Sequence, residues 1–315
     1  MFLSVILIII GFVLLIVGAD VLVDGSSGIA KKFHIPEIII GLTIVSIGTS
    51  MPELFVSITS ALDGYSDMAL GNIIGSNLSN LLLILGLSAV IKPVVFQKET
   101  RICEIPMCLL VTIILMVFCN TNGGISKIES IGLLILFGAF IGYTIYMGKK
   151  ESKNEIVEIK AEEKENNIIK NIIFVLLGIC GLKIGGDLVV NNAVNVANHF
   201  NWSEKLISLT ILAIGTSLPE LVTSVTAAIK GNSDIAIGNI IGSNIFNILL
   251  IIGVSALITP ITYNFSYNFD FSVLIVSSII LAIFPFIPPK DKMSRFNGII
   301  YLLIYIAYLL VLFIK

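Results

Sequence analysis

The sequence predicts an all-α integral membrane protein in which ten transmembrane helices form two inverted five-helix repeats. Three observations predict this fold: the composition, the number of apolar runs and an internal repeat. Of the 315 residues, 56% are hydrophobic and only 13% are charged, and the mean hydropathy is +1.02. These values lie far from the balance of a soluble domain, so lipid is the expected surrounding of most of the chain.

Ten runs of the sequence are apolar enough to cross a membrane, which takes roughly 20 mostly apolar residues per helix. No Lys or Arg precedes the first run, so we expect a permanent span there and not a cleaved signal. The runs lie at about 2–23, 37–61, 68–91, 103–119, 128–147, 171–190, 205–229, 235–258, 270–288 and 297–314.

The charged residues predict the domain organisation and the orientation. Residues 148–170 are rich in Lys, Glu and Asn and predict a cytoplasmic linker between a first repeat at 1–147 and a second at 171–315. With the N-terminus outside, nearly all Lys and Arg residues fall on the cytoplasmic side, so the positive-inside rule predicts a multi-pass protein of the cell membrane with both termini outside. The net charge of −2 and the lack of a basic tract argue against a nucleic-acid partner.

The internal repeat has a constant offset of 167 residues. Residues 41–53 (GLTIVSIGTSMPE) match 208–220 (SLTILAIGTSLPE), and residues 71–77 (GNIIGSN) recur unchanged at 238–244. Five predicted spans separate equivalent positions, and because five is an odd number the two copies cross the membrane in opposite directions. Inverted repeats are typical of secondary transporters, which bind their substrate near the membrane midplane at the repeat interface.

Each repeat places a proline and a glutamate inside a span. Pro52 and Pro219 each remove a backbone donor and clash with the carbonyl four residues earlier, so we expect the helix to open there. Freed carbonyls at membrane depth are tolerated where they line a cavity. Glu53 and Glu220 follow directly, and a carboxylate in a span must face a partner, a cavity or an ion. A simple proline kink and a protonated, hydrogen-bonded glutamate are the alternatives.

Hydroxyl and amide side chains share faces with these glutamates. Thr49 and Glu53 are spaced i, i+4, with Ser50 beside them, and the next span carries a polar stripe. Such a set of oxygens suits hard cations such as calcium and sodium, and the lack of His and Cys disfavours zinc, copper and nickel. For Asn72 and Asn239, interhelical hydrogen bonding is the alternative role. The stripe is Asn72, Ser76 and Asn80, repeated at Asn239, Ser243 and Asn247; Thr216, Ser217 and Glu220 repeat the first set.

These paired segments resemble the two alpha-repeats of the sodium/calcium exchangers in the cation/calcium antiporter superfamily, over nearly the whole chain. The resemblance implies an antiporter, not an enzyme, that needs no cofactor and exchanges three sodium ions for one calcium ion by alternating access. It implies that Glu53 and Glu220 hold calcium with backbone oxygens of Thr49 and Thr216. The implied sodium ligands are Ser50, Ser76 and the carbonyl of Ser46, and Ser217, Ser243 and the carbonyl of Ala213, with Asn80 and Asn247 lining the centre.

Two further features bear on subtype and on rival functions. Some archaeal relatives and the potassium-dependent branch carry Asp where this chain has Asn247, and Asn in both copies favours a potassium-independent exchanger. Two carboxylates offset one calcium ion but not three sodium ions, so we expect the exchange to be electrogenic. A calcium/proton antiporter is the main alternative. An intramembrane aspartyl protease would use Asp20 and Asp187, but it leaves the glutamates and prolines without a role. For these two residues, solvation at a helix end and a gate role both stay open. Lys183 lies inside the sixth span, where its stem can extend toward the interface.

Overall fold

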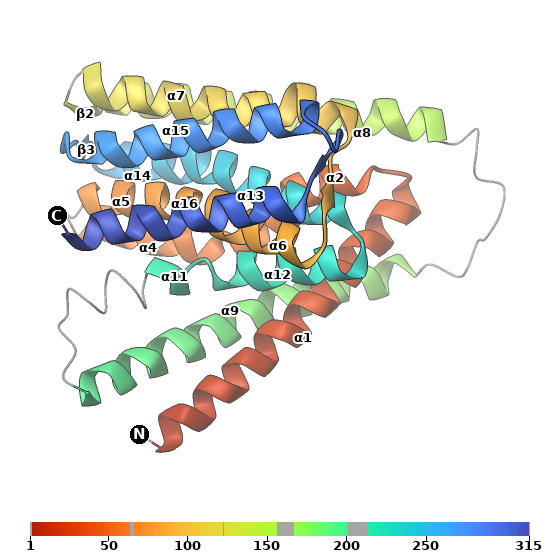
Figure 1. Cartoon of the computed structure of the whole chain (residues 1–315), viewed down its shortest axis with the longest axis horizontal. Coiled ribbons are helices and arrows are strands. Elements are labelled where there is room, and N and C mark those ends of the chain that lie inside the picture. Colours follow the sequence, from red (N-terminus) through yellow and green to blue (C-terminus); the bar gives the residue numbers. More distant parts are fainter. Residues whose placement is uncertain (1, 64–65, 122, 156–166, 201–212, 315) are drawn as a thin grey trace.

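The computed structural model describes residues 2–63, 66–121, 123–155, 167–200 and 213–314. The described chain is a bundle of long helices, with α1 (Phe2–Phe33) and α9 (Ile168–His199) crossing each other along one side of it (Figure 1). Both chain ends point toward the same end of the bundle, while the C-terminal end of α8 (Lys127–Glu155) and the start of α9 lie at the other end. Helices of the two halves pack against one another, most extensively α1 against α9.

The first half contains five groups of helical segments, some of them interrupted by π-helical turns. They are α1 (Phe2–Phe33); α2 (Glu37–Ile40), η1 (Gly41–Val45), α3 (Ser46–Thr49) and α4 (Met51–Leu62); α5 (Ser66–Leu78), η2 (Ser79–Ile84) and α6 (Leu85–Ile91); η3 (Thr100–Glu104) and α7 (Ile105–Thr121); and α8 (Lys127–Glu155).

The second half repeats this order in its described residues. It contains α9 (Ile168–His199); α11 (Ala213–Gly215) and α12 (Leu218–Lys230); α13 (Ser233–Phe246), η5 (Asn247–Ile252) and α14 (Gly253–Ile258); α15 (Tyr267–Ile283) with the 3-10 turn η6 (Phe284–Phe286); and α16 (Arg295–Ile314).

The prediction of many membrane-spanning helices agrees with the structure. Among the described residues, eight helices are long and apolar enough to cross a membrane, and the bent pair 37–49 with 51–62 makes up to nine. The predicted span at 205–229 begins in residues 201–212, outside the described residues. The helices α1, α8 and α9 extend beyond the predicted spans, and α8 and α9 enter the segment 148–170, where Lys and Glu favour a helix.

Two short antiparallel ladders join the halves, and the sequence did not predict them. Strand β1 (Val94–Val95) pairs with β4 (Lys292–Met293), and β2 (Gly124–Ile125) pairs with β3 (Ile261–Thr262). The strands β1 and β3 are equivalent in the repeat, since 167 residues separate them, and each pairs with a strand of the other half. At two residues each they are too short to leave a strand pattern in the sequence.

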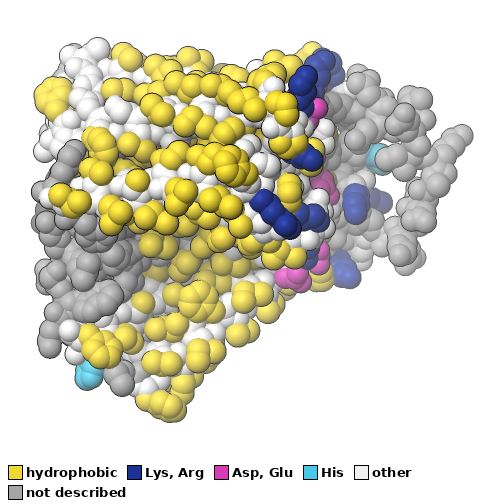
Figure 2. Space-filling model, viewed as in Figure 1, with side chains coloured by type: hydrophobic (Ala, Val, Ile, Leu, Met, Phe, Trp, Pro, Cys, Tyr) yellow, Lys and Arg dark blue, Asp and Glu magenta, His cyan; other side chains and the backbone are white. Residues whose placement is uncertain are grey.

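The helices form an inner and an outer group. Every residue of α13 from Ile235 to Phe246 is buried, whereas α1 and α16 expose large apolar side chains along much of their length. Figure 2 shows an apolar surface over most of the bundle, and on this face the described Lys and Arg side chains gather at one end. Such a surface suits lipid contact, so the polar residues inside must satisfy one another or an ion.

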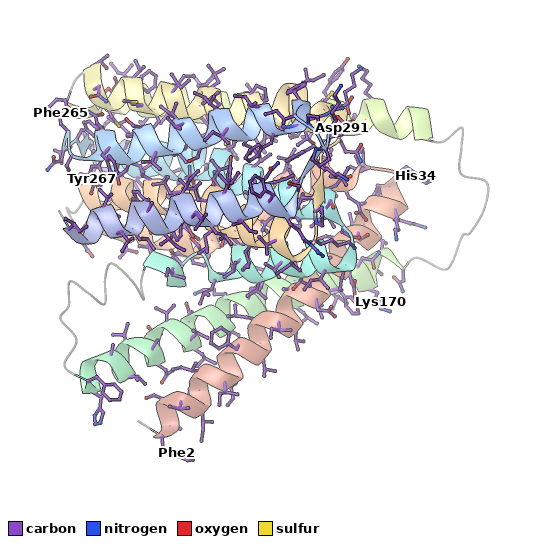
Figure 3. All side chains as sticks on the ribbon, in the orientation of Figure 1. Phe2, His34, Lys170, Phe265, Tyr267 and Asp291 are labelled. Carbon is purple, nitrogen blue, oxygen red and sulfur yellow. The ribbon has the colours of Figure 1, made fainter. Side chains whose placement is uncertain are left out.

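The ends of the bundle differ in their side chains. His34, Lys170 and Asp291 lie at the end where α8 finishes, and Phe265 and Tyr267 lie at the opposite end (Figure 3). Aromatic side chains commonly gather at the boundary of a membrane. The bundle therefore has one basic end and one end with aromatic side chains.

Candidate ion-binding site

The two proline motifs break their helices as the sequence predicted. Between α3 and α4, Ser50 has φ −83° and ψ 6°, and the helix axis bends by 49°. At the start of α12, Ser217 repeats this geometry with φ −87° and ψ 6°. Pro52 and Pro219 then occupy the first turns of α4 and α12, where a missing N–H costs no helical hydrogen bond.

The break places both carboxylates at helix N-termini inside the protein. Glu53 is 1% exposed and Glu220 is fully buried, and each lies in the first turn of its helix, where the helix dipole favours negative charge. Within the described part of the chain, no Lys or Arg forms an ion pair with either glutamate. Two buried carboxylates without a basic partner leave room for a bound cation to supply the positive charge.

Each carboxylate is contacted by a serine from the other repeat. The Ser50 hydroxyl donates to Glu220 Oε1 at 2.9 Å, and the Ser217 hydroxyl lies 3.5 Å from Glu53 Oε1. Serine at such a position usually caps its own helix, but neither hydroxyl makes a capping hydrogen bond here. Both hydroxyls are therefore used to connect the two repeats at the carboxylates.

The stripe residues Asn72 and Asn239 form interhelical hydrogen bonds, the alternative role that their sequence pattern left open. Asn239 Nδ2 donates to Ser224 Oγ at 2.9 Å, and Asn72 Nδ2 donates to Ser57 Oγ at 3.3 Å. Thr49 Oγ1 also donates to Asn239 Oδ1 at 2.9 Å, which connects α3 to α13. Sequence reasoning missed the serines at 57 and 224, although the same offset of 167 relates them.

Several of the buried oxygen atoms without a hydrogen-bond partner form pairs related by the repeat. None of the residues in these pairs is more than 2% exposed. A buried polar atom without a partner costs roughly 1–3 kcal/mol, so three of the pairs, which belong to predicted ligands, are expensive unless an ion satisfies them. These are Oε2 of Glu53 and Glu220, Oγ of Ser76 and Ser243, and Oδ1 of Asn80 and Asn247; a fourth pair, Oγ of Ser88 and Ser255, lies outside the predicted ligands.

Such a set is chemically suited to hard cations. Calcium takes six to eight oxygen ligands from carboxylates, amides and carbonyls, and sodium also prefers oxygen. Thr216 Oγ1 is a further buried oxygen without a partner. No group of three or more His, Cys, Asp or Glu side chains lies together in the described chain. The buried oxygens of this candidate site come from carboxylates, hydroxyls and amides.

Two of the predicted sodium ligands are the backbone carbonyls of Ser46 and Ala213. The Ser46 carbonyl accepts a hydrogen bond from the Ser50 N–H at 3.0 Å. Thr49 Oγ1 also lies 3.4 Å from this carbonyl, but its one proton is donated over the shorter distance to Asn239 Oδ1. Ser46 Oγ donates to Leu42 O at 2.9 Å. Ala213 begins the short helix α11, and its side chain lies outside the described parts.

The two aspartates of the protease alternative pair with different lysines. Asp20 accepts from Lys230 at 2.7 Å, and Asp187 accepts from Lys183 at 2.9 Å. Both aspartates and Lys183 have exposed side chains. A proteolytic dyad requires its two carboxylates to share one site, so this geometry speaks against it. The sequence assigned no specific role to Lys183, which here forms an ion pair with Asp187 one helical turn further along α9.

Comparison with known proteins fits this geometry. The family described as sodium/calcium exchanger protein matches residues 3–146 and 170–314. The chain belongs to the sodium/calcium exchanger family. Members of this family are transporters and not enzymes, and they carry sodium and calcium ions. The chain is therefore a multi-pass membrane protein of a cation/calcium antiporter family.

Several relatives cover the whole chain. The putative antiporter CaxA of Alkalimonas amylolytica is 38% identical over 318 residues, which cover 99% of each chain. The sodium/calcium exchanger MaX1 of Methanosarcina acetivorans is 32% identical over 343 residues, covering 98% of this chain and 97% of the relative. The structure of the sodium-calcium exchanger NCX_Mj soaked with zero Na+ and Ca2+ superimposes with a TM-score of 0.86 at 32% identity, covering 99% of each chain.

Proposed function

We propose that this exchanger family member moves calcium against sodium across a membrane by alternating access, with Glu53 and Glu220 holding the calcium ion. The observation that carries the proposal is the paired set of buried oxygens without hydrogen-bond partners, contributed equally by the two repeats. Two ionised carboxylates balance one divalent cation. When the site is empty, their charge resists transfer into a closed, low-dielectric environment, so the empty site should not change sides.

The proposed ligands follow from the repeat and from the family resemblance. Backbone oxygens of Thr49 and Thr216 complete the calcium site between the two glutamates. The proposed sodium ligands are Ser50, Ser76 and the Ser46 carbonyl on one side and Ser217, Ser243 and the Ala213 carbonyl on the other, and Asn80 and Asn247 line the centre. The Ser46 carbonyl accepts one hydrogen bond, from the Ser50 N–H, and its second lone pair can bind sodium.

The proposed architecture is ten helices in two inverted five-helix repeats, 1–147 and 171–315, with 148–170 as a cytoplasmic linker. The family match in two segments supports it, as does the pairing of β1 and β3 with strands of the opposite half. The two chain ends lie at the end opposite to Lys170 (Figures 1 and 3), which is compatible with both termini outside a cell membrane.

The proposed coupling is three sodium ions per calcium ion, which moves one net positive charge per cycle. Asn80 and Asn247 bring no third carboxylate to the site, and this favours potassium-independent exchange. One relative, MaX1, is named a sodium/calcium exchanger, and this supports sodium coupling. Calcium/proton antiport is the competing function, because the same two carboxylates can bind protons.

Ion flux into proteoliposomes tests the proposal. Purified protein in sodium-loaded vesicles should accumulate radiolabelled calcium when it is diluted into sodium-free buffer, and should not do so when both sides hold equal sodium. Vesicles with a pH gradient and no sodium serve as the comparison. Calcium uptake driven by the pH gradient, with none driven by sodium, would replace the proposal with calcium/proton antiport.

A further inference from the structure

Two asparagines outside the predicted site, Asn77 and Asn244, form a reciprocal contact between the repeats. Asn77 Nδ2 donates to the backbone carbonyl of Asn244 at 3.2 Å, and Asn244 Nδ2 donates to the backbone carbonyl of Asn77 at 3.3 Å. Both residues are 1% exposed. They are the last residues of the repeated segment GNIIGSN, and this identity was the one sequence signal for them.

The remaining oxygen of each asparagine accepts a hydrogen bond from a central residue. Asn80 Nδ2 donates to Asn244 Oδ1 at 3.0 Å, and Asn247 Nδ2 donates to Asn77 Oδ1 at 3.0 Å. Asn77 and Asn244 each donate an amide N–H to a backbone carbonyl, and this fixes the orientation of both side chains. Their Oδ1 atoms therefore face the central asparagines. Each central side chain must therefore present its nitrogen to the contact.

The consequence is a fixed direction for two amide oxygens. An asparagine side chain is nearly the same shape in both flip states, so its neighbours decide which end points where. With their nitrogens held by the contact, Asn80 and Asn247 turn Oδ1 the other way, and both of these oxygens are buried without a hydrogen-bond partner. A cation is attracted to an amide oxygen and repelled by an amide N–H, so the flip state decides whether these residues can be ligands.

We propose that Asn77 and Asn244 are positioning residues that hold the oxygens of Asn80 and Asn247 toward the transported cation. The inference rests on the proposed function for the identity of the cation. The two π-helical turns begin at this point of the chain, at Ser79 and Asn247, and π turns are frequent at functional sites. The arrangement requires an amide at positions 80 and 247, because an ionised aspartate has no N–H to donate.

A double-mutant cycle tests the proposal by calcium binding to the purified protein in detergent. The variants are Asn77→Leu, Asn247→Leu and the double variant. Asn77→Leu should weaken calcium binding about tenfold, which corresponds to about 1.4 kcal/mol. The same substitution should have no further effect once Asn247 is Leu, since Asn77 then has no amide to orient. Additive losses would mean that Asn77 acts through general packing, and they would overturn the proposal.

Three controls keep the outcome interpretable. Asn72→Leu removes a half-buried amide of the same helix that contacts Ser57 instead, and it should leave calcium affinity unchanged. If Asn77→Leu does not fold, the repeat-related cycle of Asn244→Leu with Asn80→Leu carries the same expectation. If the wild-type protein binds calcium and this binding depends on Glu53, an additive cycle overturns only the positioning role. Absence of calcium binding in the wild type overturns the proposed function itself.

Discussion

The contact between η1 and α13 predicts the effect of a single added methyl group. A Cβ at Gly242 would lie 2.8 Å from Leu42 Cα, Leu42 O and Ser46 Oγ. Two of these atoms belong to the backbone and cannot rotate away, so the substitution Gly242→Ala must push η1 from α13. Overpacking of this kind costs about 1–3 kcal/mol. Gly242→Ala should therefore loosen the turn that carries Leu42 and Ser46.

Amide hydrogen exchange measures this loosening directly. Local opening that becomes easier by about 1–3 kcal/mol should accelerate exchange of the η1 amides (Gly41–Val45) by about 5- to 150-fold. Exchange would be followed by mass spectrometry on the purified protein without calcium or sodium. A peptide from α15, which lies away from the substitution, provides the internal reference.

The repeat supplies a matched control for the same experiment. Gly75 is the counterpart of Gly242, and, apart from its chain neighbours and the backbone of its own helix turn, no described atom would lie within 4 Å of a Cβ at this position. Gly75→Ala adds the same methyl group and the same gain in helix propensity, but it should leave exchange in η1 unchanged. Equal exchange in η1 for the wild type and Gly242→Ala would refute the reasoning, as would equal acceleration by both variants.

Three further predictions concern transport. Glu53→Gln or Glu220→Gln should abolish sodium-driven calcium uptake, because each removes half of the charge that offsets dehydration of the ion; normal uptake by a folded variant would contradict this. Potassium added on the same side as sodium should leave uptake unchanged, and a severalfold rise would speak for potassium coupling through the site that contains Asn247. One net charge per cycle corresponds to about 2.3 kcal/mol per 100 mV, so a potential set with valinomycin should speed or slow uptake according to its sign. Uptake that ignores voltage would count against an electrogenic cycle.

The sequence could predict that the two glutamates lie inside the protein because the same motif occurs twice at a constant offset, while their role as ion ligands stays a prediction. One glutamate after a proline inside an apolar span has several explanations, but Glu53 and Glu220 at a constant offset have few. The helix breaks were also predictable, since the effect of Pro52 and Pro219 on the preceding turn is local. Local chemistry and internal symmetry were thus sufficient for the carboxylates and their adjoining hydroxyls.

The contacts between the repeats were not predictable. The hydroxyl of Ser50 reaches Glu220 and not the glutamate of its own helix, and this depends on how two segments far apart in the sequence pack. Helix α1 extends to Phe33, beyond the apolar span predicted at about 2–23, and its last turns contain Ser26 and Ser27. In the structure these serines are buried, and the Ser27 hydroxyl donates to Glu37. Polar residues satisfied by a neighbouring helix cannot be told from solvated ones by hydropathy alone.

The symmetry of the site does not extend to the ends of the helices. Lys230, at the end of α12, pairs with Asp20 at 2.7 Å and Asp24 at 2.6 Å on α1. The repeat relates Lys230 to Asp63 and Asp20 to Asp187, so both counterparts are acidic. If the halves exchange conformations during alternating access, two carboxylates come to the place that an ion pair occupies here. The contacts at the site also differ between the repeats, since Ser50 Oγ lies 2.9 Å from Glu220 Oε1 and Ser217 Oγ lies 3.5 Å from Glu53 Oε1. Single exposed ion pairs contribute only about 0–1 kcal/mol, so the pairs of Lys230 supply only a small part of any energetic difference between the two faces.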